Sequence, residues 1–384
     1  MNRIGKIILI LSILFISNFS YGSSLLYINS KFPLELNTTT DLYSRSQDPL
    51  LVVKREDGNY INNPALIASQ NKVSFKYSFI NNITFYNFNN YSLTSFNYKL
   101  YNDMINITLP VKYIGVLSFN FYLPYQNNVS IKDTILSQSI YLNGSLARLN
   151  FLLAKTYKNF SLGLETGKYI GSYNTDVFYI SKDSSFWAAR YTEENFFDKN
   201  YNRIDFLKIG VFYKFKTKLY LGGYYNKDFD QQIIKTIYRS SLSYYGTDIS
   251  TFFSRDTSII KFNNTYSFGI GYNISDDMFF TISGIYKGII SEGKYSRLGI
   301  GYSVGKKLEE KGNISLGFLY NNIKNYGLDI NEYSAILGRS FPFGRNRSRV
   351  DLSIGALYRI DKNYNKEMKI FTSVGIVGFD KWGR

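Results

Sequence analysis

The sequence predicts an all-β protein, a transmembrane antiparallel β-barrel of about 14 strands with a hatch in its lumen formed by the N-terminal segment. Three observations predict this class. The chain opens on a secretory leader, aromatic residues make up 18% of it without any long apolar run, and apolar and polar residues alternate with a period of two from residue 73 onwards. In a membrane barrel, side chains that face lipid alternate with side chains that face the lumen.

The leader occupies residues 1–22. It carries Arg3 and Lys6, a largely apolar stretch over residues 7–15, and small residues at Ser20 and Gly22. This is the pattern of a signal peptide cleaved after Gly22, and it is too short to stay in a bilayer as a span. No later run approaches about 18 uninterrupted apolar residues, so the sequence excludes a helical membrane protein.

The chain contains no cysteine and no histidine. The first absence removes disulfides and thiolate metal sites, and the second removes the imidazole base of hydrolases that act through Ser/His or Asp/His arrangements. No compact acidic motif suggests a carboxylate pair either. We therefore expect no enzyme activity, no catalytic residues, no metal and no cofactor.

The formal net charge of +16 falls to +14 once the two cations of the leader, Arg3 and Lys6, are removed. The basic residues are scattered, often one per strand, whereas nucleic-acid binding would need a cluster interleaved with stacking aromatics. We expect no nucleic-acid partner. Anionic lipopolysaccharide-type head groups, acidic periplasmic surfaces or an anionic cargo suit this charge better.

Residues 23–71 contain many turn formers, do not alternate, and precede all the strands, so they are predicted to form the hatch, followed by a barrel over residues 72–384. About 310 residues at roughly 22 per strand give about 14 strands, whose lumen is too wide to be filled by the strand side chains alone. The expected strands lie at 73–80, 83–100 in one or two pieces, 104–109, 113–123, 145–155, 159–169, 206–216, 218–228, 236–245, 264–273, 277–288, 294–304, 312–321, 331–340, 348–359 and 367–378.

Assigning the two faces of the strands identifies candidate ligand contacts. Between Asp205 and Tyr225, one side of the extended chain is continuously apolar and is taken to face lipid, which turns Lys208 to the lumen. The same parity gives five inward cations, which could anchor the carboxylate of an amphiphile: Arg148, Lys208, Lys214, Arg297 and Arg359. Because Glu165 and Asp351 share that parity, ordinary ion pairs in a polar lumen would explain these cations equally well.

The largest interruption of the pattern runs from Gly171 to Asn202. Its aromatic residues are spaced as in a short amphipathic helix on an extracellular loop. They would either pack on the mouth of the barrel or offer a docking surface for a hydrophobic ligand; the residues are Phe186, Trp187, Tyr191, Phe196 and Phe197.

Three short motifs resemble the long-chain fatty-acid transporter (FadL) family of outer-membrane proteins. The sequence Asn63-Pro64-Ala65-Leu66 stands directly before the first strand, as at the end of that family's hatch. The stretch YIGVLSFNFYLPY over residues 113–125 resembles an early strand of the family that closes with a Pro-Tyr pair. Residues 338–360 and the DKW ending resemble its final hairpin. The family's hatch rich in Ala-Gly pairs is replaced here by a different sequence.

The resemblance implies capture of a hydrophobic ligand at the extracellular mouth, passage controlled by the hatch, and release sideways through the wall at a kinked strand or into the periplasm. It implies an outer-membrane location in a diderm bacterium, with lipid, a hydrophobic or amphiphilic small molecule and the outer-membrane assembly machinery as partners, and a monomer. Two other functions stay open: a non-transporting barrel of the same architecture that acts in surface attachment or as a secretion accessory, and a general porin. For Asn63 and Pro64, a structural anchor of the hatch is an alternative to ligand contact, since Pro cannot donate to a strand ladder.

Overall fold

The computed structural model describes residues 63–88, 91–133, 138–180, 187–198, 202–215, 218–243, 249–260, 264–287, 295–307, 313–325, 328–343, 348–363 and 365–380. The predicted signal peptide and most of the predicted hatch lie outside these residues. One short 3₁₀ helix and 17 strands are described. Their bounds are η2 Pro64–Ser69, β1 Val73–Phe88, β2 Tyr91–Val111, β3 Gly115–Asp133, β4 Gln138–Tyr157, β5 Phe160–Ile180, β6 Trp187–Phe197, β7 Phe206–Phe215, β8 Leu219–Asp228, β9 Gln231–Ser243, β10 Ile249–Ile260, β11 Thr265–Asn273, β12 Met278–Lys287, β13 Tyr295–Lys307, β14 Asn313–Asn325, β15 Leu328–Phe343, β16 Ser348–Asp361 and β17 Lys366–Asp380.

Fourteen of the strands close into an antiparallel barrel, as predicted. The ring runs from β1 through β5 to β7 and β8, continues with β11 through β17, and closes where β17 pairs with β1. Closure pairs each strand of the ring with a neighbour on both sides over at least part of its length, which is how a β-sheet wall can span lipid. No helix among the described residues is long and apolar enough to cross a membrane.

Alternation assigns the two faces of the wall as predicted. On β11, Tyr266, Phe268 and Ile270 are exposed on the outside, whereas the residues between them are buried on the lumen side. β16 shows the same pattern over its whole length. The outward face is apolar and the inward face is rich in Ser, Thr, Asn and charged residues, which is the pattern of a barrel in a lipid bilayer.

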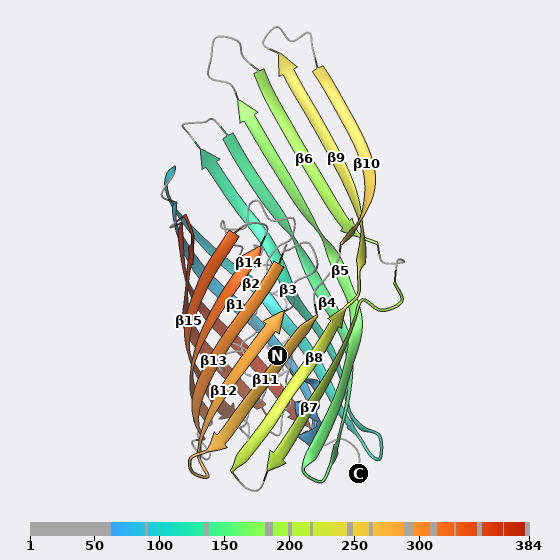
Figure 1. Ribbon diagram of the computed structural model, residues 1–384, viewed down its shortest axis with the longest axis vertical. Helices are drawn as coiled ribbons and strands as arrows, with labels where there is room; N and C mark the ends of the chain where they lie inside the picture. Colours follow the sequence, from blue (N-terminus) through green and yellow to red (C-terminus); the bar gives the residue numbers. More distant parts are fainter. Residues whose placement is uncertain are drawn as a thin grey trace, which may run out of the picture.

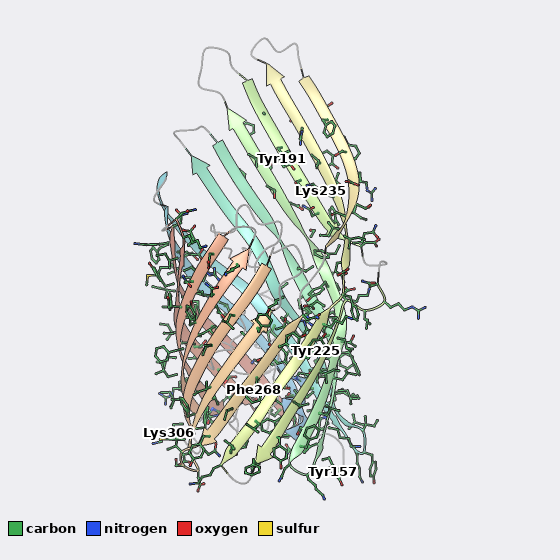
Figure 2. All side chains as sticks on the ribbon, viewed as in Figure 1. Tyr157, Tyr191, Tyr225, Lys235, Phe268 and Lys306 are labelled. Carbon is green, nitrogen blue, oxygen red and sulfur yellow. The ribbon has the colours of Figure 1, made fainter. Side chains whose placement is uncertain are left out.

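Tyrosine ladders mark one border of the outward apolar band. Tyr225, Tyr266 and Tyr286 are register partners on β8, β11 and β12, and their ring centroids lie 5.1 and 6.4 Å apart. Tyr272 lies six residues from Tyr266 on β11, about 20 Å further along the strand, and is also exposed. Such aromatic girdles sit at the two interfaces of the outer membrane. Figure 2 shows Tyr157 at the opposite end of the molecule from Tyr191.

Three strands extend the wall beyond the barrel. β5 pairs with β7 from Phe160 to Gly167 and then with β6 from Ser172 to Ile180, and the sheet continues from β6 to β9 and β10. Figure 1 shows β6, β9 and β10 rising above the level at which β8 and β11 end. We call these three strands the extension. Since the short turns lie at the other end, the extension is on the extracellular side.

The extension corrects two predictions. The interruption from Gly171 to Asn202 is not a loop with an amphipathic helix: β5 continues to Ile180 and Trp187–Phe197 form β6. A strand at Ile249–Ile260 was not predicted at all. Both faces of β10 are exposed over residues 251–259, so the apolar stripe that identifies barrel strands is missing in this strand. The predicted breaks at residues 81–82 and 101–103 are also absent, since β1 is continuous from Val73 to Phe88 and β2 from Tyr91 to Val111.

Candidate functional site

The 3₁₀ helix η2 lies inside the barrel near its periplasmic end. Asn63 caps the helix: its Oδ1 accepts a hydrogen bond from the backbone N–H of Ala65 at 3.0 Å. Its Nδ2 donates to the backbone carbonyl of Val211 on β7 at 2.9 Å, which ties the helix to the wall. Pro64 follows at the first position, where a missing N–H costs nothing. Asn63 therefore fixes both the start of the helix and its place on the wall.

The wall provides a notch for this helix. Gly163 on β5 and Gly210 on β7 are register partners that face the lumen. A Cβ on Gly163 would lie 2.3 Å from the backbone carbon of Pro64, and one on Gly210 would lie 2.1 Å from Oδ1 of Asn63. The Asn63-Pro64 backbone can approach the strands this closely only because both positions are glycine.

Apolar contacts also hold η2. We call the notch at Gly163 and Gly210, together with these contacts, the seat of the helix. Leu66 and Ile67 pack against Val116, Leu152 and Ala154 on β3 and β4. Together with Pro64 and Ala65, these two residues are buried. The predicted hatch residues Asn63, Pro64, Ala65 and Leu66 are thus held against β3, β4, β5 and β7, which is the position expected of a structural anchor. Their role in controlling passage stays a prediction.

Two of the predicted lumen cations, Lys208 and Arg359, are turned inward and have carboxylates beside them. Lys208 Nζ lies 2.9 Å from Glu165 Oε2. Arg359 bonds Glu332 at 2.7 Å and Glu367 at 2.9 Å. Since a saturated cation offers little to a ligand, this favours ion pairs within the wall over anion anchors.

Two further cations of the predicted set differ from these. Lys214 is half-buried, with Nζ 5.9 Å from the centroid of the Tyr220 ring. Arg297 lies in β13 as the register partner of Lys287 and Ile323, and its side chain is outside the described part of the structure. Ligand contact by any of the five stays a prediction.

Arg148 stands apart because its main partners are aromatic. Its guanidinium carbon lies 3.3 Å from the centroid of Phe206 and 5.5 Å from that of Tyr169. Nη1 donates to the hydroxyl of Tyr122 at 3.1 Å, and Nη2 donates to Asn226 Oδ1 at 3.1 Å. The carboxylate of Asp228 is 4.0 Å away, at the limit of an ion pair. Arg148 therefore bridges β3 to β8 on the lumen side of the wall.

The wall is split between β2 and β3. Their ladder begins at the Val111–Gly115 turn and ends at the pair Met104–Tyr122. Above it, β2 pairs only with β1 and β3 only with β4 among the described residues. The β3–β4 register shifts between Tyr122 and Tyr125, where one extra residue bulges out of the ladder. The bulge bends β3 at the level where its ladder with β2 ends.

Sequence reasoning missed the residues that hold the closed part of this seam. Asn106 and Thr108 on β2 face Ser118 and Asn120 on β3 inside the barrel, and all four are buried. Asn106 Nδ2 donates to Ser118 Oγ at 2.7 Å and to Asn120 Oδ1, and the Thr108 and Ser118 hydroxyls lie 3.0 Å apart. Their shared inward parity was readable from the sequence, but their register across the hairpin was not.

The predicted aromatic docking residues do not share one face. Phe196 is 43% exposed, whereas its neighbour Phe197 is 7% exposed and packs with Leu146 and Phe206. Tyr191 lies beside Arg239, whose guanidinium carbon is 5.4 Å from its ring centroid. Trp187 begins β6, and Phe186 lies outside the described residues. Binding of a ligand here stays a prediction.

An apolar groove of about 670 Å³ lies on the outer surface of the barrel. It crosses β7, β8, β11, β12 and β13, and its lining includes Val211, Phe268 and Ile300, all of them on the exposed outward parity. Figure 2 shows Phe268 and Tyr225 on this part of the wall. The groove faces the lipid, so it is a place for acyl chains and not a lumen site.

The extension carries a cluster whose charges predict a pH window. Burial opposes ionisation of Glu193, but hydrogen bonds from Lys235, Tyr191 and Asn195 outweigh it and hold its pKa below the usual 4.5. Burial, with the bond to Glu193, raises the pKa of Tyr191 to about 12. A carboxyl group whose pKa is lowered by folding stabilises the fold at pH values above the pKa of the unfolded chain. This stabilisation is lost as the pH falls through the pKa of the folded protein. A phenol whose pKa is raised by folding stabilises the fold fully below about pH 10. This stabilisation is lost as the pH rises towards 12.

We therefore expect the extension to be most stable between about pH 5 and pH 10. Trp187 begins β6, and the Trp382→Phe variant leaves it as the single tryptophan, so its fluorescence against pH and urea reports on this sheet. Glu193→Gln in that background should remove most of the acid limb, because it lowers the stability near neutral pH towards the level that the wild type has at low pH. An acid limb of unchanged size in Glu193→Gln would contradict the assignment.

The fold and the site define the class of protein: a closed outer-membrane-type β-barrel with a short helix seated in its lumen and a split between two wall strands. No protein-family model matches the sequence, and no curated protein matches it either. Known structures do match the fold. A FadL homologue of Pseudomonas aeruginosa superposes with a TM-score of 0.62 at 10% identity, over 91% of this chain and 100% of that one.

Two further structures agree with it. The toluene transporter TodX of Pseudomonas putida gives a TM-score of 0.61 at 12% identity, over 91% of this chain and 99% of that one. The toluene transporter TbuX of Ralstonia pickettii gives 0.55 at 9% identity, over 83% and 92%. At these identities the likeness establishes a shared fold, which is the fold that the sequence motifs predicted. TodX and TbuX are described as toluene transporters.

Proposed function

We propose that the protein is an outer-membrane channel for hydrophobic small molecules, with long-chain fatty acids among its cargo. The observation that carries the proposal is the split in the wall above Met104–Tyr122, which lies over a lumen whose periplasmic end holds η2. An apolar molecule that leaves sideways enters the lipid without crossing the aqueous periplasm, which suits cargo that dissolves poorly in water.

In this proposal, the cargo is captured at the extracellular mouth, passes into the lumen and leaves under control of the hatch. The seat at Gly163 and Gly210 supports the last step, because it holds η2 through the hydrogen bond from Asn63 to Val211 and through apolar packing, with no covalent link. The named neighbours TodX and TbuX are toluene transporters, which supports apolar cargo. The outer membrane, with its lipid and assembly machinery, is the setting that the barrel and its girdles fit; we propose a monomer.

Ion pairing in the lumen bears on the choice of cargo. Lys208 and Arg359 each already contact carboxylates, so the carboxylate of a fatty acid would have to compete for them. Neutral hydrophobic molecules meet no such competition. Transport of fatty acids is therefore the narrower proposal, and the experiment must test it separately from transport of neutral molecules.

The test is the flux of toluene and of oleate into proteoliposomes that contain the full-length mature protein. We expect faster entry of toluene than into protein-free vesicles, and a marked loss of that gain when Leu123 is deleted, because the deletion removes the extra residue of the bulge and lets β3 continue beside β2. Toluene flux without oleate flux would remove fatty acids from the cargo. No gain for either compound would overturn the channel.

Surface attachment is the second candidate, and the extension is the observation that favours it. β10 pairs with β9 on one side, and no described strand pairs with its other edge. Phe252 and Phe253 on opposite faces are 52% and 61% exposed. An exposed sheet edge with apolar residues is a surface on which another chain can add a strand. Loss of cell attachment on removal of residues 231–260, with toluene flux unchanged, would assign this role to the extension.

A further inference from the structure

The lower limit of the split is a single pair of residues. Met104 on β2 and Tyr122 on β3 are the last register partners of their ladder, and both side chains are buried on the lumen side, where they contact each other. The last pair of a ladder frays most readily, because it has a hydrogen-bonded neighbour on one side only. Whatever holds Tyr122 therefore decides where the split ends.

Arg148 holds Tyr122 from the other side. The two residues are register partners on β4 and β3, and Arg148 Nη1 donates to the Tyr122 hydroxyl at 3.1 Å. This pair is also the last before the β3–β4 register shifts at the bulge. The tie thus lies at the point where the β2–β3 ladder ends and β3 bulges, and both residues are at least nine-tenths buried.

The guanidinium is itself fixed in place by neighbours on three more strands. It lies against Phe206 on β7, donates to Asn226 on β8, and faces Tyr169 on β5. Asp228 on β8 accepts bonds from both Asn226, at 2.8 Å, and Tyr169, at 2.9 Å. A planar, multidentate group is needed to reach these partners at once, and a lysine could not replace it.

We propose that the Arg148–Tyr122 tie stops the split from running further down the β2–β3 seam and so sets the largest molecule that can leave the lumen sideways. Arg148 is the positioning residue and Tyr122 is the edge of the opening. This inference rests on the proposed function. Below the tie, side-chain hydrogen bonds among Asn106, Thr108, Ser118 and Asn120 reinforce the ladder.

The matched variants are Tyr122→Phe and Tyr320→Phe. Both remove one hydroxyl and keep the ring, but the hydroxyl of Tyr320 bonds Asn331 on the outward face, far from the seam in the ring of strands. Two measurements are made on full-length protein in lipid: amide hydrogen exchange at Met104 and Tyr122, and the flux of toluene and of the bulkier probe pyrene into vesicles.

We expect Tyr122→Phe to speed exchange at this pair and to raise the pyrene-to-toluene flux ratio about five-fold, the factor that corresponds to loss of one net hydrogen bond. Arg148→Met should act in the same way, and the double variant should add little to either single one. Tyr320→Phe should leave both measurements at wild-type values.

Three results would overturn the proposal: unchanged exchange in Tyr122→Phe, parallel changes in both fluxes, or fully additive effects of the two single variants. Failure of the proposed function is distinguishable from these. If the wild-type protein passes neither probe, both the channel function and the proposed size limit are wrong. The exchange result still shows whether the Arg148–Tyr122 tie holds the ladder. Because Tyr122→Phe keeps the ring, it keeps the result interpretable even if Arg148→Met does not fold.

Discussion

Replacing Gly163 by alanine is expected to displace η2 from its seat. The new Cβ would lie 2.3 Å from the backbone carbon and 2.5 Å from the carbonyl oxygen of Pro64, and backbone atoms cannot rotate away as a side chain can. The chain has no cysteine, so a single Cys at the fully buried Ala65 reports the change. A water-soluble maleimide should label Ala65→Cys slowly in the wild-type background and many times faster together with Gly163→Ala.

Gly378→Ala is the matched control, because a Cβ there would meet nothing within 4 Å. It should leave the labelling rate of Ala65→Cys unchanged. The flux of toluene should rise in Gly163→Ala if the seat restrains the hatch, and should stay at the wild-type level in the control. Equal labelling in the two glycine variants would show that the notch does not hold the helix.

Replacing Arg359 by methionine is expected to cost the most stability. The guanidinium joins Glu332 on β15 to Glu367 on β17, and its removal leaves two buried carboxylates beside each other without their shared partner. Loss of one partner of a buried ion pair costs about 3–5 kcal/mol. Urea unfolding in lipid vesicles should show a decrease of this size in the free energy of unfolding.

Arg190→Met provides the comparison. Arg190 pairs with Asp176 at 2.6 Å on the extension, but its side chain is 59% exposed. Exposed ion pairs are worth about 0–1 kcal/mol, so this variant should unfold almost as the wild type does. If Arg359→Met were no more destabilising than Arg190→Met, the lumen would have to be wet enough to solvate Glu332 and Glu367.

The sequence was sufficient to predict the barrel, because each wall strand has one face to lipid and one to the lumen. Apolar and polar residues therefore alternate along it. It also placed the Asn63-Pro64 segment directly before the first strand, where the structure has it. It failed at β6, where Phe196 is exposed and its neighbour Phe197 is buried on the opposite side. Aromatic spacing alone then resembles a helix as much as a strand.

The contacts of the lumen could not be predicted for a different reason. The parity of Arg359 was correct, but its partners Glu332 and Glu367 come from two other strands, and their opposition depends on the register of each ladder. The same holds for Gly163 and Gly210, which form one notch only because β5 pairs directly with β7. Register depends on turns and on the stagger of the whole ring, which local sequence does not specify.

β5 has a mechanical consequence for the whole molecule. A single unbroken strand runs from Gly163, against the 3₁₀ helix, to Ile180, which pairs with β6 of the extension. The distance is about 55 Å at the rise of an extended chain. Hydrogen-bonded strands resist stretching, so a pull on the extension is carried down β5 as a load and not absorbed by a hinge. Figure 1 shows this strand continuing from the barrel into the projecting sheet. A force on the projecting sheet is therefore transmitted along β5 to the site where η2 is held.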